Sequence, residues 1–112
     1  MANTFKVKTK DGSSVNANTD MTIYTCPSST QTTIIGMSIA NITSSQITVD
    51  VKLTNADGDN IFIVKNAPVP AASSLVPIGG DQKLVMEASD VLVVQSDTAN
   101  SADTALSILE IT

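Results

Sequence analysis

Short runs in which apolar and polar residues alternate, separated by turn sequences, constrain the fold of this chain more than any other feature. The clearest run is QITVDVKLT at 46–54. Its apolar side contains Ile47, Val49, Val51 and Leu53. A period of two residues is typical of a strand with one buried face. The Asp-Gly step in the next segment, NADGDN at 55–60, favours a hairpin turn into a second strand at 61–65.

The rest of the chain repeats this rhythm of strand and turn. Further apolar runs predict strands at 21–26, 32–42, 74–78, 82–87, 91–96 and 104–111. The connections include a loop rich in Pro, Ala and Ser at 67–74 and a turn, GGD, at 79–81. Turn signals about every eight to twelve residues predict an all-β fold. We expect a single antiparallel β-sandwich, immunoglobulin-like or jelly-roll-like, of about seven to nine strands.

The first 20 residues differ in composition from the rest. A length of 112 residues fits one domain, and we expect an N-terminal arm or edge strand at 1–20 before a β-sandwich domain at 21–112. A strand in the first segment has two unlike sides, formed by Lys6, Lys8 and Lys10 and by Phe5 and Val7. The lysines fit two interpretations: a solvated edge strand whose charges discourage edge pairing, or an arm that reaches an acidic neighbour.

The long strand predicted at 32–42 also has two unlike sides. Strict alternation separates Ile35, Met37 and Ile39 from Ile34, Gly36, Ser38, Ala40 and Ile42. The second side carries mostly small groups, which permit close approach of a neighbouring sheet or subunit.

Composition limits the core and the partners. Hydrophobic residues make up 42% of the chain and aromatic residues only 3%, so the core must be aliphatic. The net charge of −5 opposes binding to phosphate backbones, and we expect no nucleic acid partner. The single cysteine, Cys26, is expected to be a small buried side chain. Residues 1–20 contain no secretory apolar segment and no run is long enough for a bilayer, so we expect synthesis in a cytoplasm and no membrane partner.

Residues for common catalytic chemistry are scarce. The chain has no histidine, which removes Ser-His and Cys-His pairs and the commonest zinc ligand. IGGDQK at 78–83 lacks the spacing of a phosphate-binding loop, and a hairpin turn is favoured there. We therefore expect a protein that is not an enzyme and has no cofactor or metal.

Three weaker features have simple structural interpretations. NADGDN gathers oxygen ligands but lacks the later glutamate of a calcium loop, so a hairpin turn is favoured. Asn41-Ile42-Thr43 matches a glycosylation sequon, and a chance match is favoured. Five further carboxylates are expected to be solvated at turns or strand ends, and they are Glu87, Asp90, Asp97, Asp103 and Glu110.

The chain resembles a family of small virion structural proteins from tailed bacteriophages, especially phages of marine bacteria and cyanobacteria. The resemblance covers most of the chain and is carried by MANTFK at the start, IYTCPSSTQTTIIGMSIANITSSQITVDV at 23–51, VKNAPVPAASSLVPIGGDQKLVME at 64–87 and LSILEIT at 106–112. Ser28-Ser29 depart from the glycine or alanine expected after the proline, which changes only a turn.

The resemblance implies a β-sandwich present in many copies on a phage particle. The expected function is non-enzymatic: a capsid decoration or cement protein that binds the outer shell and is located in the virion. The expected partners are the major capsid protein or other virion proteins and further copies of the chain. The candidate contact residues are Phe5, Lys6, Lys8, Lys10, Ala67, Pro68, Val69, Pro70, Ala71 and Ala72.

Two alternatives remain open at this point. A neck or tail component would have the same fold and a lower copy number. A carbohydrate- or receptor-binding module would need aromatic platforms, of which Phe5, Tyr24 and Phe62 are the whole supply, and Phe62 lies in a core-like strand. The 67–74 loop is itself open to two interpretations, a contact or a simple connector.

Overall fold

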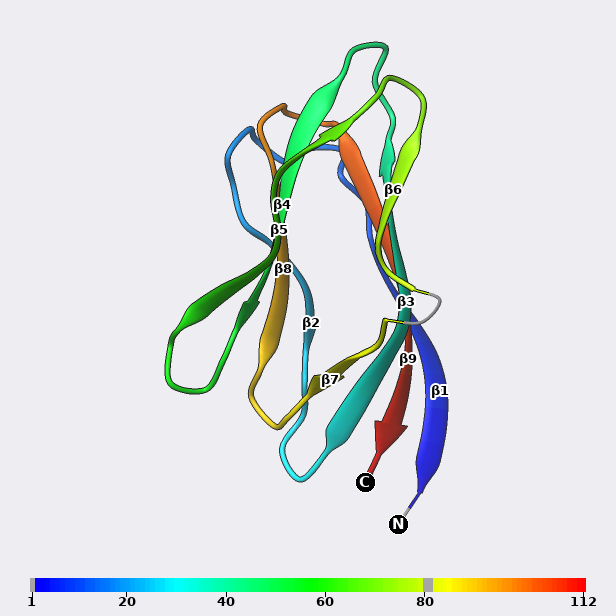
Figure 1. Cartoon of the computed structure of the whole chain (residues 1–112), viewed down its shortest axis with the longest axis vertical. Helices are drawn as coiled ribbons and strands as arrows, with labels where there is room; N and C mark the ends of the chain where they lie inside the picture. Colours follow the sequence, from blue (N-terminus) through cyan, green and yellow to red (C-terminus); the bar gives the residue numbers. More distant parts are fainter. Residues whose placement is uncertain (1, 80–81) are drawn as a thin grey trace.

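Two antiparallel sheets packed face to face form the protein, as the computed structural model of residues 2–79 and 82–112 shows (Figure 1). The strands of these residues are β1 (Asn3–Lys10), β2 (Met21–Thr25), β3 (Gln31–Asn41), β4 (Ile47–Thr54), β5 (Asn60–Val69), β6 (Ser74–Ile78), β7 (Leu84–Met86), β8 (Val91–Ser96) and β9 (Ala102–Ile111). The predicted all-β fold, a single antiparallel β-sandwich of seven to nine strands, is confirmed.

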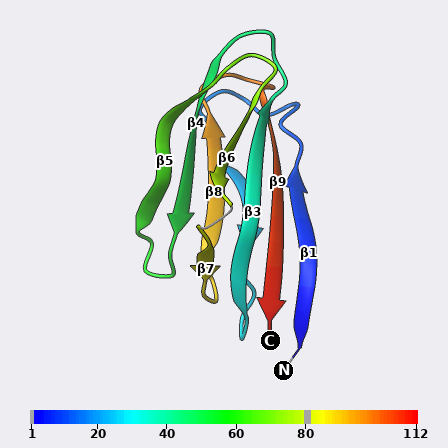
Figure 2. The ribbon, with the colours of Figure 1, turned by 45° about the vertical axis from the view of Figure 1, so that its right-hand side comes forward.

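The two sheets have different sizes and edges. Sheet A has the order β1-β9-β3-β6, and the short strand β7 pairs with β3 below β6 (Figure 2). Sheet B has the order β2-β8-β4-β5. Most connections lead from one sheet to the other. The outer strands β1 and β2 form one lateral edge of the sandwich, and β5 and β6 form the other. The two termini lie side by side, because Ala2 and Thr112 exchange backbone hydrogen bonds of 3.2 and 2.9 Å.

An aliphatic core fills the space between the sheets. In β4 the predicted alternation is confirmed for three residues, since Ile47, Val49 and Val51 are buried, and Leu53 at the end packs partly against them. The largest fully buried side chains from the other strands are Ile34, Ile39, Val69, Ile78, Met86, Leu92, Val94, Leu106 and Ile108. Cys26, at the end of β2, is buried as predicted.

The prediction of which β3 residues share a face is wrong for its first half. A β-bulge between Ile34 and Gly36 shifts the register against β9. Because a bulge adds one residue to a strand, Ile34 faces the core together with Met37 and Ile39, and Ile35 does not. Strict alternation assigned Ile34 to the other side, where it would be available to a neighbour.

The Pro-rich loop begins later than its composition predicted. β5 continues through Ala67, Pro68 and Val69, which pair with β4. Proline is tolerated there because β5 is an edge strand and needs no donor on its free side. β9 begins at Ala102, two residues before the predicted start. The predicted GGD turn includes residues 80 and 81, which lie outside the described residues, as does residue 1 of the predicted N-terminal arm.

The crossover from β1 to β2 depends on a close backbone approach at Gly12. Its N–H donates to Asp103 Oδ1 at 2.8 Å, and a Cβ atom at this position would lie 1.9 Å from the carbonyl oxygen of Ala102. Only glycine leaves room for that contact. The crossover therefore closes one end of the sandwich against the start of β9.

Candidate protein-contact surfaces

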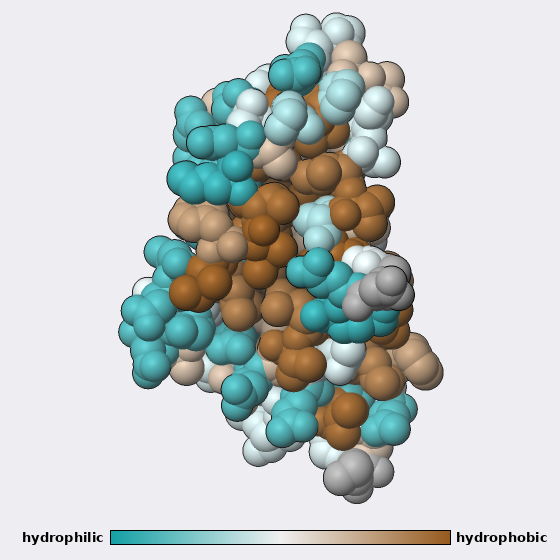
Figure 3. Space-filling view, in the orientation of Figure 1, coloured by the Kyte–Doolittle hydropathy of each residue, from teal (hydrophilic) through white to brown (hydrophobic). Residues whose placement is uncertain are grey.

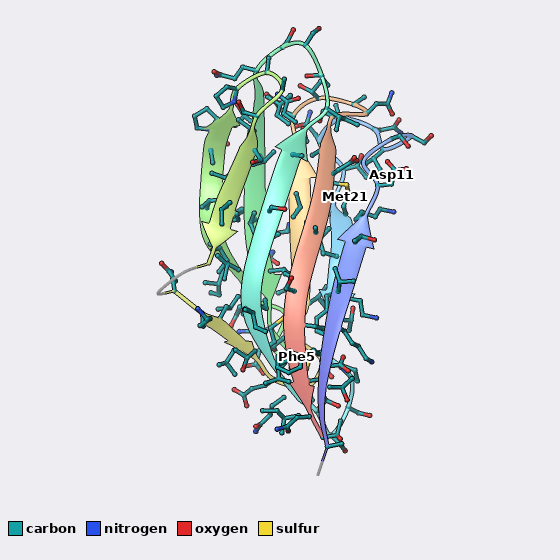
Figure 4. The ribbon with its side chains drawn as sticks, turned by 90° about the vertical axis from the view of Figure 1, so that its right-hand side faces the viewer. Phe5, Asp11 and Met21 are labelled. Carbon is teal, nitrogen blue, oxygen red and sulfur yellow. The ribbon has the colours of Figure 1, made fainter. Side chains whose placement is uncertain are left out.

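Strand β1 places its apolar residues on the outer face of sheet A and its lysines on the opposite side, where they still reach solvent. Phe5 is 74% exposed and Val7 is 66% exposed on the outer face of sheet A (Figure 4). Lys6, Lys8 and Lys10 pair in register with residues of β9 that face the core. The two sides separate as the sequence predicted, and the apolar side chains of Phe5 and Val7 are largely exposed.

Lys6 reaches an acidic group of its own chain. Its Nζ lies 2.8 Å from Oε1 of Glu110, whose side chain is 7% exposed. The hydroxyl of Tyr24 donates a short hydrogen bond to the other carboxylate oxygen. Because that hydroxyl proton is used, Thr32 Oγ1 donates to Tyr24 Oη at 2.9 Å. The expectation that Glu110 is solvated is wrong: the carboxylate lies between the sheets and links β9 to β1 and β2.

The buried cluster shifts two pKa values in opposite directions. The Lys6 ammonium, followed by the Tyr24 hydroxyl, lowers the pKa of Glu110 because both donate to its charged form. Burial, followed by the bond to Glu110, raises the pKa of Tyr24. The cluster therefore holds an ionised carboxylate and a neutral phenol beneath β1.

The free edge of β1 presents unpaired backbone groups. Ala2 and Thr112 form a pair that exchanges both hydrogen bonds. Since such pairs alternate along an antiparallel ladder, the even residues of β1 bond to β9. The N–H and C=O groups that point away from the sheet belong to Asn3, Phe5, Val7 and Thr9. In the described part of the chain, β1 pairs with no strand other than β9 (Figures 2 and 4).

The outer face of sheet A, called here the A face, is flat and mostly uncharged. One row of register partners crosses it from Val85 through Thr33 and Leu109 to Phe5. Val85 is 60% exposed, and Val76 on β6 is 62% exposed. Large apolar side chains gathered on one face of a soluble domain mark an interaction surface.

The outer face of sheet B, called here the B face, is covered by its own ion pairs. Lys52 pairs with Asp20 at 3.1 Å, and Lys65 pairs with Asp50 at 3.8 Å. Lys65 also lies 4.4 Å from the ring centroid of Phe62. Phe62 is 42% exposed, so its assignment to a core-like position is wrong.

The second predicted contact segment, residues 67–72, lies at the lateral edge opposite β1. Val69 was predicted to be a contact residue, but it is fully buried and cannot reach a partner. Ala67 is half-buried, and both residues face the core from β5. Pro68, Pro70, Ala71 and Ala72 are exposed. The fold therefore separates the two predicted contact segments, and β1 alone lies on the A face.

Asn41 holds the crossover between β5 and β6. Its Nδ2 donates to the carbonyl oxygens of Ser45, Val69 and Pro70 at 2.8, 3.0 and 3.2 Å, and its Oδ1 accepts from Thr43. The side chain is buried and fully used, which agrees with a chance match to the sequon.

Apolar side chains also gather along the mouth between the sheets on the β5 and β6 edge (Figure 3). The partly buried residues that pack on the core from this edge are Ile63, Val64, Ala67, Leu75 and Leu84. Ile61, at the start of β5, is 53% exposed. The core is thus less completely covered at this edge than beneath β1.

The segment NADGDN at 55–60, which the sequence offered as a possible calcium loop, forms a local turn. Asn55 Oδ1 accepts hydrogen bonds from the backbone N–H groups of Asp57 and Asp59, both at 3.0 Å. Gly58 has a φ of 88°, which completes the hairpin. Within residues 2–79 and 82–112, no group of three His, Cys, Asp or Glu residues could hold a metal ion. The same residues include no helix with the length and apolarity of a membrane span.

No model of a known protein family matches the chain, and no curated protein matches it at a significant level.

The sequence did not predict the buried cluster of Lys6, Tyr24 and Glu110, although it contained a signal for it. Glu110 has the same parity as Leu106 and Ile108 in β9, so alternation alone places it on the core side. The only tyrosine, Tyr24, was available as its partner.

Proposed function

We propose that the protein is a non-enzymatic structural component of a tailed-phage particle, a decoration or cement protein that binds the outer shell through its A face. The observation that carries the proposal is the exposure of Phe5, Val7, Val76 and Val85 on one largely uncharged face. Burial of such side chains across neighbouring shell subunits stabilises the assembled shell, since a ligand that binds only the assembled state shifts the equilibrium towards it.

The sequence resemblance to virion structural proteins supports the same function. An interface of ordinary size buries about 800 Å² on each partner, which a flat sheet face can supply. Many symmetric copies would reuse the same patch.

Mass spectrometry of purified particles and a binding assay test this function. We expect the chain in virions, and we expect purified protein to bind particles that lack it. A double variant, Phe5→Ser with Val85→Ser, should weaken that binding by about tenfold or more, because both are large apolar side chains exposed on the A face. Phe62→Ser, at an exposed aromatic residue of the B face, is the matched control. Absence of the chain from virions would contradict the proposal.

Copy number decides between the head and the alternative positions. A decoration protein is expected in copies on the order of hundreds, whereas a neck or tail ring has about 12 or fewer. Quantitative mass spectrometry against the major shell protein measures this ratio directly.

A further inference from the structure

We propose that the free edge of β1 accepts an extended strand from an acidic partner, in which Asp or Glu occupies every second position and apolar residues occupy the others. The proposal rests on the proposed function only for the source of that strand, a neighbouring virion protein. Three features of β1 define the chemistry of the partner: its backbone groups, its lysines and its exposed apolar residues.

The backbone of β1 is already arranged for another strand. The outward N–H and C=O groups of Asn3, Phe5, Val7 and Thr9 have the spacing of a ladder, and they occur on an eight-residue strand that β9 holds along its whole length. An added strand would gain main-chain hydrogen bonds from these residues. Phe5 and Val7 would then lie in hydrogen-bonded pairs, and the lysines between them would lie in non-hydrogen-bonded pairs.

The lysines select the charge of the added strand. In an antiparallel ladder the side chains of non-hydrogen-bonded pairs are the closest, about 4.5 Å apart at Cα. Lys6 is already paired with Glu110 at 2.8 Å, so Lys8 and Lys10 are the lysines that would meet the added strand. Opposite charges in such pairs stabilise a sheet and like charges destabilise it. Carboxylates at alternate positions match the spacing of Lys8 and Lys10.

The exposed residues select the other side of the added strand. Phe5 and Val7 lie on the A face, so the alternate residues of the partner would lie beside them. Apolar side chains at these positions would extend the row that already runs from Val85 to Phe5. The added strand would thereby widen the A face and cover its two most exposed large side chains.

A second copy of the same chain does not meet these requirements. In antiparallel pairing of β1 with the β1 of another copy, even-numbered residues lie opposite even-numbered residues, so the lysines of both copies share one side and meet no carboxylate. Among the described strands, β4 has one acidic residue, Asp50, and β9 has Asp103 and Glu110 on opposite faces. None has carboxylates at successive alternate positions.

The experiment uses the full chain and a labelled synthetic peptide of about ten residues in which Glu and Val alternate. Controls are a peptide in which Lys and Val alternate and a scrambled Glu-Val peptide. Binding is measured by fluorescence anisotropy at neutral pH, and hydrogen exchange follows each amide. We expect saturable binding of the ordered Glu-Val peptide and no saturable binding of either control peptide. The amides of Phe5 and Val7 should gain protection, whereas those of Lys6 and Lys8 are protected beforehand by β9.

Two variants separate the backbone from the charge. Val7→Pro removes an outward N–H that β9 does not use, so the fold should survive while peptide binding falls by about tenfold or more; Val7→Ala keeps the N–H and should lose less. Lys8→Glu with Lys10→Glu leaves the backbone intact and should transfer the preference to the Lys-Val peptide. Circular dichroism confirms the fold of each variant.

The outcomes distinguish this proposal from the proposed function. Equal binding of ordered and scrambled peptides, or no change in the double charge variant, would overturn strand addition at β1 even if the protein binds particles. Protection of the same amides in a peptide-free dimer would assign the edge to a second copy and would also overturn it. Specific peptide binding by a chain that is absent from virions would leave the edge site standing and remove its proposed source.

Discussion

Sheets A and B place their charged residues on opposite sides. Sheet B displays Asp50, Lys52 and Lys65 on its outer face, where they pair with one another and with Asp20. Sheet A turns Lys6 and Glu110 inward, where the carboxylate is buried. The B face is therefore satisfied within the chain, and the A face is left with apolar side chains that meet only water.

This difference separates stability from recognition. An ion pair with one exposed partner contributes little to stability because water screens it, and in the two pairs of sheet B the exposed partners are Asp20 and Lys65. A carboxylate removed from water depends on each of its hydrogen bonds, so its loss is costly. The charges of sheet A should thus matter for folding, the charges of sheet B should matter little, and the A face should matter for partners.

The largest effect on stability is expected for Glu110→Ala. The substitution leaves the Tyr24 hydroxyl without its acceptor between the sheets and opens a cavity, and we expect a loss of about 3 kcal/mol in the free energy of unfolding. Urea denaturation followed by circular dichroism measures it. Tyr24→Phe, which removes one hydrogen bond and keeps the ring, should cost less. A loss below about 1 kcal/mol for Glu110→Ala would show that the cluster is not structural.

Acid should weaken sheet A through the same carboxylate. The pKa of Glu110 is lowered in the folded protein, so its contribution is fully present above the ordinary value of 4.5 and is lost as the pH falls through the lowered folded value. The Ser13 backbone N–H also lowers the pKa of Asp11, so Asp11 contributes to the same loss of stability at acid pH. The contribution of Glu110 can be isolated by measuring the free energy of unfolding from pH 6 downwards in Lys6→Met. Because this variant lacks the ammonium that lowers the pKa of Glu110, its stability should fall less steeply with decreasing pH. If the free energy of unfolding of Lys6→Met fell with pH as steeply as that of the unchanged protein, Glu110 would not be the source of the acid sensitivity.

A smaller effect is expected for Lys65→Met on the B face. The variant removes the 3.8 Å ion pair with Asp50 and the contact with the Phe62 ring, and the Lys65 side chain is 57% exposed. We expect a change of about 0.5 kcal/mol, reduced further at high salt. Urea denaturation at two salt concentrations measures it. A cost equal to that of Glu110→Ala would remove the contrast between the sheets.

The smallest effect on stability is expected for Phe5→Ser. The ring is 74% exposed, so the free energy of unfolding should change by no more than about 0.5 kcal/mol. Thermal unfolding measures this change, and Phe62→Ser serves as its counterpart on the B face. Strong destabilisation by Phe5→Ser would mean that the A face serves the fold and is not free for a partner.

Much of the fold could be predicted because strand periodicity is local. Alternation in β4 identified Ile47, Val49 and Val51 as core residues, and the Asp-Gly step located the hairpin that follows. The same rule failed at Ile34 and Ile35, because a bulge inserts one residue without changing the composition of the run. Val69 was assigned to a loop because prolines precede and follow it, although an edge strand tolerates proline.

The candidate site was predictable only in part. The sequence placed Phe5 and Val7 opposite the lysines, which follows from the period of two alone. It did not indicate that Lys6 meets Glu110, because these residues are distant in sequence and become neighbours only when β1 pairs with β9. The exposure of the A face depends on the same pairing.

By itself, the sequence determined an aliphatic, all-β domain, because composition, periodicity and turn residues act within a few positions of the chain. Tertiary structure alone decided where β3 shifts its register, which edge of β1 stays open and which groups the buried Glu110 carboxylate meets. These properties depend on contacts between the two ends of the chain, where Tyr24, Lys6 and Glu110 come from three different strands.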